Sequence, residues 1–536
     1  MNPLLGSAVF LTAFFSFISR VCPTVYADDS PETVTAMLTL GITHPPGDPV
    51  LALAGKAWCL LPLGNMALRM NLLSAFLASL ACLLAVRLAV RIFPGRLPAV
   101  AASLSALALF VFNPVMVQQA AVAKGAVYTM NMALVLAAAT ALRNRNNIAA
   151  ALVFGLLASH HWMTFAAVSP VLGGWWAVNL VRYKAGRPRR AMISILVFVL
   201  GMSVQLFLPL RASQDIFLAW GRPSTMQRWS AHYLRKVYLP EEMRATPLTW
   251  RRQAAEGART IYRQVGWPGL ALAAAGVPAL LSSAPPALAI SGAGILVPWI
   301  ITAVYLDLRP ELMHLLGIYL LSSWLALVFL AVAGASWLGG PGRKAVRLLP
   351  LLLTAGAAAI LYPAGRIYNV SHSTWSYDTA RAMLAPLPPN AGLLVTSDLD
   401  TFPLWYFQAV EGYRADVLVV NTTMMRHQWY REQIQGLSGV RRLGDLDDRD
   451  AAVRYMVFSS RRFWFSAAGD IVGVPPDLPR VPYHLTYQLG GGKPVVSFRG
   501  LPARGIFDCW SRLPEPTAAR SLDYLTEVIR NTSRPR

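Results

Sequence analysis

Long apolar runs recur through the first two thirds of this sequence, and they limit the fold more than any other feature. A helix needs about 20 apolar residues to cross the hydrocarbon core of a bilayer. Only 14% of the residues are charged, roughly half of the share that is usual in soluble domains. We therefore expect a polytopic α-helical membrane protein with about 11 transmembrane helices. The runs lie at 5–21, 68–90, 97–113, 118–142, 147–159, 162–181, 191–210, 268–283, 286–305, 313–335 and 346–363.

The net charge of +22 has a simple explanation in a membrane protein. In a soluble chain such a charge would suggest a nucleic-acid partner. Here the basic residues collect in short loops that all fall on one side of the predicted membrane, at 87–96, 143–147, 181–190 and 342–347. The positive-inside rule makes that side cytoplasmic, so no nucleic-acid partner is expected. The sequence predicts a multi-pass protein, of the type found in bacterial inner membranes, whose longer polar segments face the periplasm or exterior.

Four segments follow from this topology. Residues 1–211 form an N-terminal transmembrane block with an acidic external loop at 22–67, and residues 212–266 form a basic external segment. Residues 267–363 hold the remaining transmembrane helices. Residues 364–536 are largely soluble, with short β-branched runs at 393–397 and 415–421 on either side of a helix-like stretch. This alternation predicts a C-terminal extracytoplasmic α/β domain.

The N-terminus allows a second interpretation. The sequence VYA before Asp28 fits a signal-peptide cleavage site, which would remove residues 1–27. No Lys or Arg precedes Arg20, so the positive start of a signal peptide is missing, and the first apolar run is expected to remain as a membrane helix.

The external loop after the first apolar run carries an unusual group of polar residues. Asp28, Asp29 and Glu32 are close together, and Ser30-Pro31 between them is typical of a helix start. The stretch HPPGDP then holds His44 on a stiff, proline-rich turn. Such carboxylates can be ordinary solvated loop charge. A rigid acidic loop at a membrane surface is also what a general base would need if its substrate arrives from the lipid.

The block from 23 to 75 resembles the opening signature of a protein O-mannosyltransferase-like membrane family, formerly a domain of unknown function, in the GT-C glycosyltransferase superfamily. Its pattern D-S-G-E, H-P-P-G-Y-P, then R and N before S-A, is met here by Asp29, Ser30, Glu32, His44, Pro45, Pro46, Gly47, Pro49, Arg69 and Asn71. Further blocks at 155–170, 206–238 and in the C-terminal region are similar to the same family.

Two departures from the family pattern concern lost carboxylates. The family usually has a glutamate before V-Y where this chain has Ala126, and Arg222 replaces the acid of W-G-D-P. The losses could reflect changed handling of the donor or acceptor, or a metal role that this member lacks.

The resemblance implies a GT-C-like fold and the transfer, with inversion, of a mannose-like sugar from a polyprenyl-phosphate donor to an extracytoplasmic protein or glycan acceptor. Asp29 is the expected catalytic base, and Glu32 is expected to orient the acceptor or Asp29. Asp28 is expected to be a solvated neighbour, although it could exchange roles with Asp29. The matched positions imply a donor- or substrate-binding set made up of Asp28, His44, Arg69, His160, His161, Arg211, His232 and Arg235.

The basic residues have competing interpretations. Arginines between 222 and 263 could attract lipid headgroups instead of binding the donor phosphate, and His160 or His161 could be a packing residue. The function of Lys124, within a predicted span, is open. Asp398 and Asp400 follow a strand and could bind a ligand or cap a helix.

No metal site is assigned from the sequence, because it contains neither HxxxH nor HExxH, and no cofactor is certain. A divalent cation could still bind the loop carboxylates together with water and substrate oxygens. Two rival functions are a lipid-linked sugar transporter or flippase, which should show two related halves, and a non-catalytic envelope scaffold.

Overall fold

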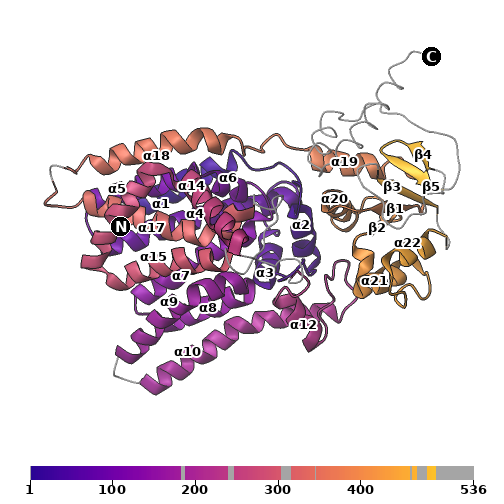
Figure 1. Cartoon of the computed structure of the whole chain (residues 1–536), viewed down its shortest axis with the longest axis horizontal. Helices are drawn as coiled ribbons and strands as arrows, with labels where there is room; N and C mark the ends of the chain where they lie inside the picture. Colours follow the sequence, from indigo (N-terminus) through magenta and orange to yellow (C-terminus); the bar gives the residue numbers. More distant parts are fainter. Residues whose placement is uncertain are drawn as a thin grey trace, which may run out of the picture.

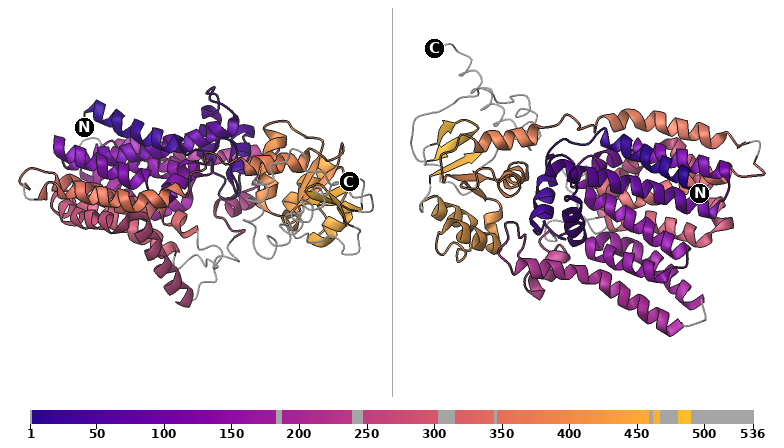
Figure 2. Two further views of the ribbon diagram at one scale, coloured as in Figure 1. Left: turned by 90° about the horizontal axis from the view of Figure 1, so that it is seen from above. Right: turned by 180° about the vertical axis from the view of Figure 1, so that it is seen from behind.

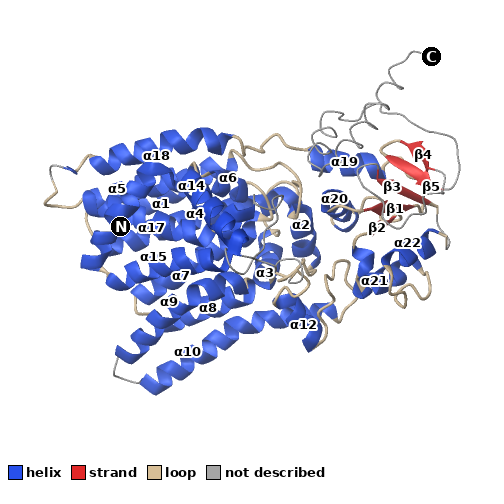
Figure 3. Cartoon of the chain, in the orientation of Figure 1, coloured by secondary structure: helices blue, strands red, loops and turns tan. Residues whose placement is uncertain are grey.

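The computed structural model describes residues 2–182, 187–238, 247–302, 315–343, 346–458, 462–466 and 480–489. It has two parts that lie end to end, a long helical bundle and a smaller α/β domain (Figures 1 and 2). Among the described residues, all strands lie in the α/β domain, and the bundle consists of helices joined by loops and turns (Figure 3). The predicted fold class is therefore confirmed.

Every predicted apolar run has a helix in the bundle. Within the described part of the chain, seven helices are long and apolar enough to cross a membrane, or eight if the bent pair α5 and α6 counts as one span. The remaining runs form three shorter apolar helices. The long helices are α4 (Met66–Ile92), α7 (Gly125–Arg143), α9 (Trp162–Arg182), α10 (Arg187–Met202) continued by η1 (Ser203–Leu206) and α11 (Phe207–Ala212), α14 (Pro247–Ser283), α17 (Leu321–Leu338) and α18 (Leu349–Arg366). The bent pair is α5 (Arg96–Val111) and α6 (Pro114–Ala120), and the shorter helices are α1 (Pro3–Ile18), α8 (Asn147–His160) and α15 (Pro285–Ile300).

The run at 118–142 differs from the single span that its hydropathy predicts. Helix α6 ends at Ala120 and α7 begins at Gly125, with a turn between them. A Cβ atom on Gly125 would lie 1.6 Å from the carbonyl oxygen of Gln119, so only glycine allows the chain to fold back so tightly. The turn brings Lys124 to the end of the bundle that carries the acidic loop.

Small residues allow the central helices to approach closely. A Cβ on Gly276 of α14 would lie 2.1 Å from the carbonyl oxygen of Leu330, and one on Gly334 of α17 would lie 2.0 Å from that of Leu272. Such glycine contacts are typical of helix pairs in membranes, where van der Waals packing replaces the hydrophobic effect.

Short helices cover the end of the bundle next to the α/β domain. They include α2 (Ser30–Thr39) and α3 (Pro49–Trp58) from the acidic loop, and α12 (Met226–Tyr233) from the basic segment. The predicted helix start is confirmed, since Asp29 is the N-cap residue of α2 and Pro31 lies in its first turn. A short helix α16 (Leu316–Tyr319) precedes α17.

The C-terminal domain contains a five-stranded sheet of order β2-β1-β3-β5-β4. Strand β1 pairs in parallel with β2 and β3, while β5 is antiparallel to both β3 and β4. The two strands and the helix predicted between them are confirmed as β1, β2 and α20. The elements are α19 (Trp375–Leu384), β1 (Gly392–Val395), α20 (Asp398–Ala409), β2 (Leu418–Asn421), η5 (Met424–Arg426), α21 (Gln428–Ser438), α22 (Arg449–Val457), β3 (Phe463–Ser466), β4 (Arg480–Tyr483) and β5 (Thr486–Leu489).

The domain is docked on the bundle through α2 and α20, which share one continuous buried core. Trp220 from the basic segment packs against Trp429 of α21, with ring centroids 5.5 Å apart. Gln433 of α21 donates a hydrogen bond to the carbonyl oxygen of Phe217 at 2.9 Å. The domain is thereby held next to the acidic loop.

Candidate active site

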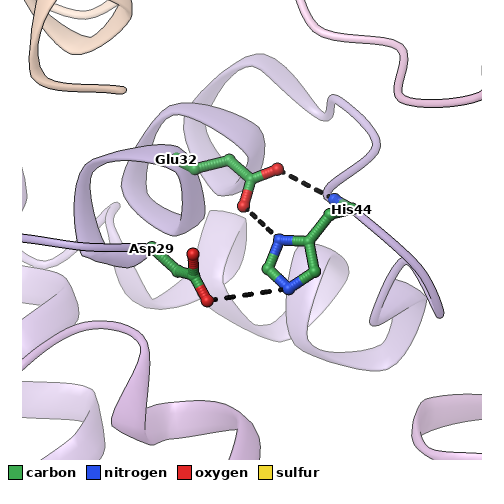
Figure 4. Close-up of side chains that lie close together, drawn as sticks. All are labelled: Asp29, Glu32 and His44. Atoms are coloured by element: carbon green, nitrogen blue, oxygen red, sulfur yellow. Dashed lines mark hydrogen bonds and ion pairs between the residues drawn. The ribbon is translucent and has the colours of Figure 1, made fainter. Parts of the chain in front are cut away.

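The acidic loop folds back on itself so that Asp29, Glu32 and His44 meet (Figure 4). Helix α2 carries Glu32 in its first turn, while Asp29 is its N-cap residue. The chain leaves α2 through Leu40 in the left-handed conformation and returns along the HPPG turn that bears His44. The proline-rich turn thus presents the imidazole to both carboxylates.

Glu32 fixes the position of His44. The Glu32 side chain is completely buried, and its Oε1 accepts a hydrogen bond of 2.8 Å from the backbone N–H of His44. Its Oε2 lies 2.6 Å from His44 Nδ1. A buried carboxylate is stable only when its oxygens have such partners, so Glu32 orients the ring of His44. Its predicted role toward the acceptor or Asp29 stays a prediction.

Asp29 has a different environment. Its side chain is 33% exposed, and its Oδ2 lies 3.6 Å from His44 Nε2 and 3.4 Å from the Nζ of Lys124. Burial by itself raises the pKa of Asp29, but the charges of His44 and Lys124 outweigh that effect and hold this pKa below its ordinary value. Asp29 is therefore an ionised, accessible carboxylate.

His44 has a partner in either protonation state. When the ring is neutral, Nε2 can accept a hydrogen bond from Lys124 Nζ at 3.1 Å, and when it is charged, Nε2 faces Asp29. Burial lowers the pKa of His44, Glu32 and Asp29 raise it, and the net result lies above the ordinary value of histidine.

A cavity of about 780 Å³ opens beside Asp29 and His44 and extends deep into the bundle. Along α7 its lining runs from Tyr128 to Arg143, a distance of about 22 Å at the helical rise per residue. Most of this length is apolar, with side chains from α4, α7, α9, α15 and α17. The cavity therefore joins the polar end of the bundle to its apolar interior.

The C-terminal domain supplies one wall of the same cavity, through Asp398 and Phe402 of α20. Asp398 follows the carboxyl end of β1, where ligands bind in open α/β sheets. Its side chain faces the cavity, between the two parts of the protein. Burial there, followed by the charges of Asp29 and Glu32, raises the pKa of Asp398 to about 7.

Of the predicted binding residues, Asp28, Arg235 and His161 lie near Asp29 or line its cavity. Arg235 and His161 are both cavity residues, and the positive charge of Arg235 contributes to the lowered pKa of Asp29. Asp28 precedes Asp29 with a left-handed backbone. These positions suit the roles that the sequence predicts, which stay predictions.

Arg69 and Arg211 bind backbone carbonyls instead. Arg69 donates to the carbonyl oxygens of Cys59 and Gly64, which closes the loop after α3. Arg211 donates to the carbonyl oxygens of Leu40 and Thr39 at the end of α2. Both guanidinium groups hold the loop that carries the site.

His160 and His232 are buried away from the cavity lining. His160 lies next to Val127, whose carbonyl oxygen is 3.2 Å from Nε2, and its Nδ1 lies 3.8 Å from Asp48 Oδ1. His232 fills the space left by Gly47 and Gly221, whose Cβ positions would each lie 3.0 Å from its ring nitrogens. His232 thus packs against the HPPG turn at Gly47.

The departures from the family pattern have clear positions. Ala126 is completely buried within the core beneath the loop. Arg222 lines a separate, open groove of about 880 Å³ between α12 and α21. Within the basic segment, Arg244 lies outside the described residues.

Sequence reasoning did not place Lys124 in the site, and it left the role of Asp398 open between ligand binding and a helix cap. Lys124 was expected inside a membrane span, and the Gly125 turn that moves it to the cluster could be found only from backbone crowding. Asp398 was placed correctly at a strand end, but nothing local to it indicates that this edge of the sheet faces the membrane loop.

Among the residues that the structure describes, Asp29, Glu32 and His44 form the one cluster compact enough to be considered for a metal ion. Their candidate ligand atoms all lie within 4.8 Å of one another. Carboxylate and imidazole groups suit several divalent cations, and whether this set suits one depends on what else contacts these atoms.

Comparisons with known proteins agree with the predicted resemblance. Residues 29–208 match the family model described as the protein O-mannosyl-transferase TMEM260 N-terminal domain, and residues 376–438 match TMEM260-associated domain 2. The chain is 25% identical over 483 residues to the protein O-mannosyl-transferase TMEM260 of Mus musculus. The aligned region covers 82% of this chain and 65% of the mouse protein. The chain therefore spans about two thirds of the length of that relative.

A solved structure confirms the type of fold. The chain resembles ArnT from Cupriavidus metallidurans in the apo state with a TM-score of 0.55 over 91% of this chain and 98% of that one. The sequence identity is 13%, so this likeness concerns the fold, which is GT-C-like as predicted.

Proposed function

We propose that this protein, as a relative of the TMEM260 O-mannosyl-transferases, is an integral-membrane glycosyltransferase. It transfers a mannose-like sugar from a polyprenyl-phosphate donor to a hydroxyl group of an extracytoplasmic acceptor, with inversion. The observation that carries the proposal is the position of Asp29. This ionised carboxylate lies at the polar mouth of a cavity whose apolar part runs along the bundle.

In the proposed reaction Asp29 acts as general base. It accepts the proton of the acceptor hydroxyl while that oxygen bonds to the anomeric carbon, and the bond from this carbon to the phosphate oxygen breaks. The electron pair of that bond leaves with the polyprenyl phosphate. Attack opposite the leaving group inverts the anomeric centre, through a transition state like that of glycoside chemistry. General-base help of this kind contributes roughly 10²–10⁴ in rate.

The cavity suits a donor with two unlike ends. The largely apolar part of its length of about 22 Å along α7 would take part of a polyprenyl chain. Arg235 and His161, near its polar end, would meet the phosphate, for which arginine offers paired hydrogen bonds. The donor phosphate and the base would then lie within one cavity.

The charge pattern supports an extracytoplasmic site. The basic helix ends, such as Arg91 of α4 and Arg143 of α7, are at the opposite end of their helices from the acidic loop. With that basic end inside, Asp29 and the α/β domain would face the periplasm or exterior.

The proposal can be tested with purified full-length protein and a radiolabelled polyprenyl-phosphate mannose. Transfer of label to envelope proteins or glycans is expected, and the variant Asp29→Asn should lose it without losing its fold. A transporter would move the donor between leaflets without forming a new glycosidic bond. A scaffold would work equally well with Asp29→Asn. Donor movement without a new bond, or full function of Asp29→Asn, would therefore reject the proposed glycosyltransferase activity.

A further inference from the structure

We infer that Lys124 supplies the fixed positive charge of this site, in the place where a divalent cation would otherwise bind to Asp29, Glu32 and His44. This inference deepens the proposed function, on which its catalytic part depends. Lys124 acts through Asp29 and His44 and is therefore a positioning residue. The argument depends on which ligand atoms remain available to a metal ion.

Both carboxylate oxygens of Glu32 already have a partner in His44. One accepts from the backbone N–H of His44 and the other lies 2.6 Å from the His44 ring, and the side chain is completely buried. A metal ion bound there would compete with the two contacts that hold the HPPG turn in place.

The ammonium group of Lys124 contacts one oxygen of Asp29 and the second ring nitrogen of His44. Its Nζ lies 3.4 Å from Asp29 Oδ2 and 3.1 Å from His44 Nε2. A metal ion bound through these two atoms would need them at about 2.0–2.6 Å, so ion and ammonium could not both bind them. Two unit positive charges about 4 Å apart near a protein surface already repel strongly enough to weaken binding on the order of 10³-fold, and a divalent ion is repelled more strongly.

The backbone holds Lys124 in this position. Its N–H donates to Ser30 Oγ at 3.3 Å, and the following Gly125 is the residue that permits the tight turn. The side chain is 14% exposed, so most of it is enclosed. Lys124 therefore reaches the cluster from a fixed turn and not as a mobile surface side chain.

The direct test is Mn²⁺ binding to purified full-length protein, measured by electron paramagnetic resonance, because it needs no turnover. We expect weak binding by the wild type. Lys124→Met should bind one Mn²⁺ at least about 10²-fold more tightly, given the repulsion that it removes, and adding Asp29→Asn should abolish the gain. Lys124→Arg should remain weak, and Lys56→Met, at a lysine that donates to the carbonyl oxygen of Leu38, is the matched control.

Two results would overturn the inference. One is stoichiometric Mn²⁺ binding by the wild type that Asp29→Asn removes, and the other is Lys124→Met binding as weakly as the wild type. If Lys124→Met does not fold, the wild-type measurement still decides. In the transfer assay the wild type should be insensitive to EDTA, and Lys124→Arg should retain more activity than Lys124→Met. Absence of any transfer would reject the proposed function but leave the binding result valid.

Discussion

Replacing Glu32 by glutamine isolates the contribution of the buried carboxylate. The substitution keeps the size of the side chain but removes its charge and turns one oxygen into an NH₂ group. Glu32 now accepts from two donors of His44, its backbone N–H at 2.8 Å and its ring at 2.6 Å. A glutamine can accept from only one of them, so either a buried donor loses its partner or the ring proton moves to Nε2.

Both alternatives are unfavourable. If the proton moves to Nε2, it points at the Lys124 ammonium 3.1 Å away, and two donors then face each other. Hydrogen bonds to a charged group contribute about 1.5–3 kcal/mol each. With one bond lost and one weakened, we expect the free energy of unfolding to fall by about 2–4 kcal/mol.

The assay compares thermal unfolding of the wild type and Glu32→Gln in the same detergent. Glu411→Gln is the matched control, because Glu411 is exposed and accepts a hydrogen bond from Tyr377 at 3.0 Å, a contact expected to contribute less than about 1 kcal/mol. Sugar transfer by Glu32→Gln should also fall, since His44 and Asp29 lose their arrangement. Unchanged thermal stability together with unchanged transfer would refute this account of Glu32.

Three further predictions concern other parts of the site. Asp29→Asn should lower turnover by roughly 10²–10⁴ in the transfer assay while its melting temperature stays close to that of the wild type. Because the pKa of Asp398 is raised to about 7, the protonated form is favoured in the folded protein, so stability is greatest at low pH and is lost as the pH rises through about 7. Melting curves at pH 6 and pH 8 should therefore differ less for Asp398→Asn than for the wild type. Gly334→Val should lower the yield of folded protein, measured by gel filtration, because even a Cβ would lie 2.0 Å from the carbonyl oxygen of Leu272.

Much of the fold could be predicted from hydropathy and turn chemistry. The apolar runs predict the long helices of the bundle, except for the break between α6 and α7, because the bilayer requires such lengths whatever their order in space. Ser30 and Pro31 predict the start of α2, because proline is favoured in the first turn of a helix. The β-branched runs around α20 likewise depend on side-chain pattern alone.

The composition of the site could be predicted only in part. Asp29, Glu32 and His44 are close in sequence, and the resemblance to a known family names all three. Arg69 and Arg211 share that resemblance, yet they bind carbonyl groups 5 to 172 residues away in the sequence, which no local pattern reveals. The arrival of Lys124 and Asp398 depends on a backbone turn and on domain docking, and both are tertiary effects.

The cavity wall formed by α20 affects how well the protein would protect its sugar donor from hydrolysis. Water is a competing nucleophile for any activated sugar. Because the C-terminal domain forms one wall of the cavity, the cavity excludes water only while that domain stays docked on the bundle. The contacts of Trp220 with Trp429 and of Gln433 with Phe217 hold the domain in this docked position. Under the proposed function these contacts would set the ratio of productive transfer to hydrolysis, so mutations between the two parts would release free sugar before any loss of binding.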